Sequence, residues 1–160
     1  MYLRVVFNLL FIFSFAATQG KLPHQGFDRS AFYKAIASGN TTEIDVQLSA
    51  VREASIPEKE AFEGTLLMKK AGMVGKAKDK LSLFKSGRLK LESSILKDNN
   101  NTEYRFLRLL IQEHAPKIVK YRNQLEDDSE NIRTNFKNLS SVLQQVILDY
   151  SKKSTILKIP

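Results

Sequence analysis

The stretch that decides the fold is TEYRFLRLLIQEHA, residues 102–115. Apolar and aromatic side chains cover most of a helical circumference here: Tyr104, Phe106, Leu107, Leu109, Leu110 and Ile111. Only Arg105, Arg108 and Gln112 form a polar stripe, at positions i, i+3 and i+7. A helix that is apolar nearly all round is typical of the interior of a protein. We therefore predict a buried central helix that other helices surround.

Amphipathic helical patterns lie on both sides of this stretch. Upstream, capping residues and proline predict four helix starts, at Asp28, Asn40, Pro57 and about Lys76. Downstream, three more starts are expected at Pro116, Asp127–Ser129 and Ser140. No period-two run of strand length is present. The predicted fold is all-α, with about eight helices as antiparallel hairpins in an irregular bundle or a short α-solenoid.

Two of these helices carry apolar stripes that should face the core. The long helix ending near Lys97 is expected to bury Leu81, Phe84, Leu91 and Ile95. The last helix has the stripe Val142, Leu143, Val146, Ile147 and Tyr150. The sequence does not decide whether the tail after it docks on the domain.

The N-terminus has the pattern of a secretory signal. Arg4 precedes the apolar run 5–13, and small residues follow, with cleavage expected after Thr18. The apolar stretch from Val5 to Ala17 has 13 residues, fewer than the roughly 20 that span a bilayer, which disfavours an uncleaved anchor. We expect a signal peptide at 1–18, a flexible lead-in at 19–27, one helical domain at 28–152 and a tail at 153–160. The protein is then exported, either periplasmic or secreted.

Composition excludes several classes of chemistry. The 160 residues contain no cysteine and only two histidines, which rules out thiol catalysis and zinc sites built on cysteine. His24 lies in the lead-in, and His114 near a helix end favours a capping role. No phosphate-binding glycine loop, calcium loop or nucleophile motif is present. We predict no metal, no cofactor and no enzymatic activity.

The strongest candidate binding cluster is Arg105, Arg108 and Gln112, with His114 nearby. Two guanidiniums one turn apart on an apolar helix suit a carboxylate or phosphate ligand. Because a buried arginine needs a partner whatever its function, internal pairing with acids near Glu126–Glu130 is the favoured alternative. A remote third interpretation is an enzyme site around Arg105, Arg108 and His114.

A basic surface is the second candidate. The formal charge is +8, and removing Arg4 with the signal leaves 24 basic against 17 acidic residues, a charge near +7. The long fourth helix carries the cations that would meet an anionic polymer or membrane surface: Lys76, Lys78, Lys80, Lys85 and Lys90. Nucleic-acid binders concentrate charge on one face and expose aromatic rings. These lysines spread around the helix, so a solvated lysine-rich helix is favoured and no specific nucleic-acid recognition is expected.

Two partial resemblances add expectations. Residues 91–104, with the turn Asp98–Asn101, resemble a tetratricopeptide-repeat boundary, although Asn99 replaces the expected proline. Residues 101–108 and 149–153 resemble small exported helical proteins of Bacteroidetes that have no characterised activity. The first resemblance implies a degenerate helix pair with a binding groove, and the second implies a bacterial envelope or secreted location.

The expected function is a non-enzymatic exported protein that binds a partner, preferably another protein, through a helix-lined groove. A charge-driven binder of anionic polymer or lipid surface is the alternative. Three N-x-Ser/Thr sequons, at Asn40, Asn100 and Asn138, would matter only in a eukaryotic secretory route.

Overall fold

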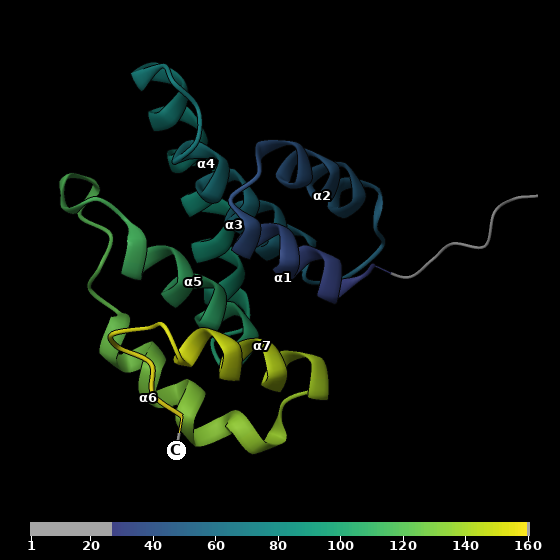
Figure 1. Cartoon of the computed structure of the whole chain (residues 1–160), viewed down its shortest axis with the longest axis vertical. Coiled ribbons are helices and arrows are strands. Elements are labelled where there is room, and N and C mark those ends of the chain that lie inside the picture. The colour runs from purple at the N-terminus through teal and green to yellow at the C-terminus, as the bar shows by residue number, and fades with distance from the viewer. Residues whose placement is uncertain (1–26, 160) are drawn as a thin grey trace, which may run out of the picture.

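The computed structural model describes residues 27–159, and this part is helical throughout with no strand. It contains seven α-helices and two single 3-10 turns (Figure 1). The helices are α1 (Arg29–Ser38), α2 (Thr41–Glu53), α3 (Lys59–Ala71), α4 (Ala77–Lys97), α5 (Thr102–His114), α6 (Leu125–Asn135) and α7 (Ser141–Ser151). The 3-10 turns are η1 (Lys117–Val119) and η2 (Phe136–Asn138). The predicted all-α class is confirmed.

Side-chain caps set the helix starts that the sequence predicted. The Asp28 carboxylate accepts hydrogen bonds from the amides of Ser30 and Ala31, at 2.8 and 3.1 Å. Asn40 caps α2 in the same way, and α1 ends at Gly39, whose φ of 67° is left-handed. Because such caps satisfy amides that have no partner inside the helix, they fix where each helix begins.

A pair of glycines lets α3 and α4 pack very closely. A Cβ added to Gly64 would lie 2.6 Å from the carbonyl oxygen of Gly87, and a Cβ on Gly87 would overlap the carbonyl oxygen of Gly64. Real Cβ atoms do not approach so closely, so neither position has room for a side chain. The antiparallel hairpin of α3 and α4 is therefore built around a backbone-to-backbone contact.

Helix α5 is central, as predicted. It contacts α3, α4 and α6, and Figure 1 shows it between the α3–α4 hairpin and the α6–α7 pair. Phe106, Leu107 and Leu109 are fully buried. One continuous hydrophobic core extends from Phe32 in α1 to Leu157 beyond α7.

The connection between α5 and α6 differs from the sequence prediction. A sixth helix was expected after Pro116, but only the turn η1 forms, because Lys120 takes a left-handed φ of 46° and ends it. Ile118 is consequently 88% exposed. Tyr121 is buried by another route, donating a hydrogen bond to Glu92.

Two further details were predicted wrongly. Leu81, expected in the core, is 51% exposed, since it lies in the first half of α4, which projects with the α3–α4 loop from the rest of the bundle (Figure 1). Helix α6 begins at Leu125 without a side-chain cap. Asp128, expected as part of the cap, instead lies inside the helix with its side chain fully buried.

The segment after α7 packs against the domain. Leu157 is fully buried and Ser154 is 3% exposed. Glu113 on α5 holds this segment by accepting hydrogen bonds from Ser154 Oγ at 2.7 Å and from the amide of Thr155 at 2.6 Å. The tail that the sequence left undecided is thus docked through residue 159.

The predicted N-terminal signal and lead-in lie outside the described residues, apart from Phe27. Within 27–159, no helix has the length and apolarity needed to cross a membrane.

Candidate functional site

The polar stripe of α5 forms a closed ion-pair cluster. Arg108 donates to both carboxylate oxygens of Asp128, through Nε and Nη2, each at 2.7 Å. Its third nitrogen donates to Glu92 at 3.0 Å. Burial alone would lower the pKa of Arg108, but the hydrogen bonds and charges of Asp128 and Glu92 outweigh it and raise the pKa above its ordinary value. The favoured sequence interpretation, internal pairing with an acid of a neighbouring helix, matches this arrangement.

Arg105 and Gln112 are also used internally. Arg105 donates to Asp128 at 3.1 Å and to the backbone and side chain of Asn99. Gln112 is fully buried and exchanges two hydrogen bonds with Gln124. No buried side-chain nitrogen or oxygen of the described residues lacks a partner. A ligand at this stripe would therefore have to displace Asp128.

His114 does not join the arginines. Its Nδ1 lies 3.1 Å from the carbonyl oxygen of Leu110, one turn back on α5. The ring is exposed and lies near Tyr150 of α7. The structure thus separates His114 from Arg105 and Arg108 and places it on another face of α5.

The lysine-rich helix α4 does not present a single charged face. Lys90 is taken up by Glu60 and Glu63, at 2.7 and 3.0 Å. The remaining four are exposed and form no ion pair with a described residue: Lys76, Lys78, Lys80 and Lys85. At 100° per residue they fall into two groups on opposite sides of the helix.

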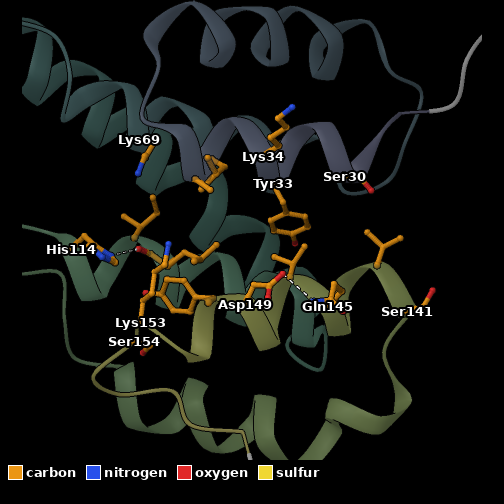
Figure 2. A pocket seen from close by; sticks show the side chains of 17 residues that line it. Ser30, Tyr33, Lys34, Lys69, His114, Ser141, Gln145, Asp149, Lys153 and Ser154 are labelled. Atoms are coloured by element: carbon orange, nitrogen blue, oxygen red, sulfur yellow. Dashed lines mark hydrogen bonds between the residues drawn. The ribbon is translucent and has the colours of Figure 1, made fainter.

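A hollow with a volume of about 730 Å³ lies between α1, α5 and α7. It is shown in close-up in Figure 2. Its apolar lining is Ile36 and Ala37 from α1, Leu110 and Ile111 from α5, and Val142 and Val146 from α7. Small-ligand sites are typically concave, largely apolar and about 300–1,000 Å³ in volume. We call this feature the α1/α5/α7 groove.

Two tyrosines hold the walls of the groove in place. Tyr33 on α1 donates a 2.9 Å hydrogen bond to Glu103, and Tyr150 on α7 donates a 2.5 Å bond to Glu113. Burial is the largest cause that raises the pKa of both phenols, and the neighbouring carboxylates raise it further. Both hydroxyls are committed to structural hydrogen bonds, so the groove offers no activated phenol.

The same carboxylate that binds Tyr150 is strongly acidic. Burial by itself would raise the pKa of Glu113, but hydrogen bonds from Tyr150, Ser154 and Thr155 lower it to about 2. A carboxylate with four donors is fixed in its ionised form. Glu113 therefore links α5, α7 and the tail behind one wall of the groove.

The ionisable groups around the groove are mainly basic in type. Lys34, Lys69, His114 and Lys153 line it, against the single carboxylate of Asp149. Asp149 already accepts from Lys152 at 2.7 Å and from Gln145 at 3.0 Å. No group of three or more metal-ligating side chains occurs in the part of the chain that the structure describes.

Site and fold together define an all-helical protein with an apolar groove and a saturated ion-pair cluster. Comparisons with protein-family models, curated proteins and solved structures found no match to this chain. Function is therefore inferred from the geometry of the groove.

Sequence reasoning predicted a helix-lined groove but did not locate it, although one signal for its position exists. Helix α7 carries a wider apolar stripe than the core covers: Leu143 and Ile147 are buried, whereas Val142 is 39% exposed and Val146 is half-buried. A helix whose apolar stripe is wider than the surface it packs against leaves some apolar residues exposed. Such a stripe in a sequence indicates a possible groove wall. The identity of the opposite wall, α1, has no sequence signal of its own.

Proposed function

We propose that this protein is an exported, non-enzymatic binding protein whose ligand occupies the α1/α5/α7 groove. The observation that carries the proposal is an apolar hollow of about 730 Å³ left open between helices that are otherwise closely packed. An apolar surface of this kind gains free energy when a ligand covers it.

The chemistry around the groove supports binding over catalysis. Tyr33 and Tyr150 are bound to carboxylates, and His114 has only a backbone carbonyl as partner. A catalytic histidine needs a nucleophile or an orienting acid within hydrogen-bond reach. The export assignment rests on the signal pattern in residues 1–18.

Photo-cross-linking from the groove tests this proposal. A benzophenone amino acid replaces Val142, which lines the groove, or Val46 on α2, an exposed valine outside it. Each variant is incubated with envelope and secreted fractions of the source organism, washed in high salt, irradiated and analysed by mass spectrometry. We expect a discrete adduct, protein or small molecule, from position 142 alone. Equal labelling from both positions, or none from either, would reject the groove as the binding site.

The charge-driven alternative keeps one observation in its favour, the four exposed lysines at the start of α4 that pair with no described residue. It predicts retention on a polyanion column that falls steeply with salt, because counterion release makes such binding salt-dependent. Replacing Lys76, Lys78, Lys80 and Lys85 by glutamine would abolish this retention, while labelling from position 142 would be unchanged.

A further inference from the structure

Of the three lysines that line the groove, none of which pairs with a described residue, only Lys69 is half-buried. Lys69, near the end of α3, is half-buried and lines the groove, and it forms no hydrogen bond or ion pair with any described residue. Burial lowers its pKa. By contrast, its neighbour Lys70 forms an ion pair with Asp45 at 2.5 Å. The Lys69 side chain is only partly withdrawn from water, and an anion that arrives from outside would compensate its charge.

Other basic groups lie at the same end of the groove. In Figure 2, Lys69, His114 and Lys153 are gathered at one end, whereas Ser30 and Ser141 lie at the other. The one acidic group of the lining, Asp149, is already bonded to Lys152 and Gln145. One end of the groove is therefore basic and the rest of its lining is apolar. A matching ligand has an anionic group at one end and an apolar body.

We propose that the α1/α5/α7 groove binds a single-chain amphiphile with a carboxylate head, a long-chain fatty acid in chemical class. The carboxylate pairs with Lys69 at the basic end, and the acyl chain lies along Ile36, Leu110 and Val146. This inference rests on the proposed function and specifies its ligand. A fatty acid satisfies the unpaired ammonium and covers the apolar walls at once.

The size of the groove favours an acyl chain over a partner's helix. An α-helix with its side chains is about 10–12 Å across, so two turns of it fill roughly the whole 730 Å³ or more. An acyl chain is much thinner and can lie along the apolar lining of the groove. Each methylene that it buries contributes about 0.8 kcal/mol, which makes chain length a measurable determinant of affinity.

Binding of defined lipids to the purified protein tests the head-group assignment. Palmitate, methyl palmitate and butyrate are titrated by calorimetry into the wild type, Lys69→Met and Lys70→Met. We expect palmitate to bind, and Lys69→Met to weaken it roughly tenfold or more, as for loss of a charged hydrogen bond. Lys70→Met, whose wild-type ammonium is held by Asp45, should bind palmitate as the wild type does. Methyl palmitate should not distinguish the variants, and butyrate should not bind.

A second pair of variants locates the ligand. Ala37→Trp places an indole in the groove, whereas Ala50→Trp places one on an exposed position of α2 outside it. Loss of palmitate binding in Ala37→Trp alone supports the proposal. Circular dichroism of both variants establishes that each is folded.

Three results would overturn the inference, and they can be told apart. If palmitate and its ester bind equally to all variants but not to Ala37→Trp, the groove binds apolar ligands and the carboxylate assignment is wrong. If no lipid binds while a protein adduct forms from position 142, the occupant is a partner's polypeptide and the proposed function survives. If both lipid binding and cross-linking fail, the proposed function fails as well.

Discussion

Helix α5 has two contrasting faces, one charged and fully paired, the other apolar and open. On one, Arg108, Asp128 and Glu92 form an ion-pair cluster in which every buried donor and acceptor is used. On the other, Leu110 and His114 face a groove that no described residue fills. The charged face was the strongest candidate binding cluster in the sequence, with internal pairing as the favoured alternative, and the apolar face is the one left open. The comparison teaches that charge on a central helix indicates a site only when its partners are missing.

The largest expected effect comes from breaking the closed face. Arg108→Met leaves Asp128 buried without its main partner, and such changes cost about 3–5 kcal/mol of unfolding free energy. Urea unfolding followed by circular dichroism measures it. Lys152→Met, which removes an exposed pair with Asp149, serves as the control and should change stability little. A similar small loss for both variants would show that the cluster is not a stabilising element.

The next effect concerns the close contact between α3 and α4, the hairpin against which α5 packs. Gly87→Ala forces a methyl group against the backbone of Gly64, and overpacking of this kind costs about 1–3 kcal/mol. Gly75→Ala is the matched control, since a Cβ there meets no atom within 4 Å. Thermal unfolding of the two variants should therefore differ, and equal melting temperatures would contradict the tight crossing.

The pH dependence of stability tests the role of Glu113, which lies behind one wall of the groove. The folded pKa of Glu113 is about 2, against 4.5 for an ordinary glutamate, so its ionised form is favoured in the folded state. The stability that it contributes is complete above about pH 4.5 and is lost as the pH falls toward about 2. Glu113→Gln should flatten this part of the stability profile. Glu53→Gln, an exposed carboxylate at the end of α2, should leave it unchanged, and an unaltered profile in both would show that the tail is not held by this charge.

The smallest expected effect is an increase in the free energy of unfolding, whereas the preceding variants lower it. Lys69→Met removes an unpaired, half-buried charge and should raise the free energy of unfolding by about 0.5 kcal/mol or more, as often happens when a residue kept for binding is replaced. Lys70→Met loses its pair with Asp45 and should give no gain. Chemical denaturation without lipid measures both. Destabilisation by Lys69→Met would mean that Lys69 has a structural role.

The fold was largely predictable because its signals are local. Capping by Asp28, Asn40 and Ser140, the stop at Gly39 and the burial of Phe106 and Leu107 each depend on a few neighbouring residues. Such signals act within one helical turn, so the sequence displays them directly.

What escaped prediction depends on distant partners. Leu81 sits on a helical stripe like that of Leu91, but only the structure shows that its end of α4 projects from the bundle. The sequence pattern around Asp128 predicts a capping residue, but in the structure this residue is buried and bonded to Arg108 on α5. The groove needs α1 and α7, far apart in the chain, to face each other across α5. No local pattern encodes that spacing.

The bond between Glu113 and the segment after α7 bears on when the binding surface comes into being. Tyr150, Ser154 and Thr155 all follow the other six helices in the chain. During synthesis, α1 and α5 leave the ribosome well before these residues, and they have no second wall to face. The groove is therefore among the last features to assemble, because its α7 wall and the segment that Glu113 holds come last in the chain.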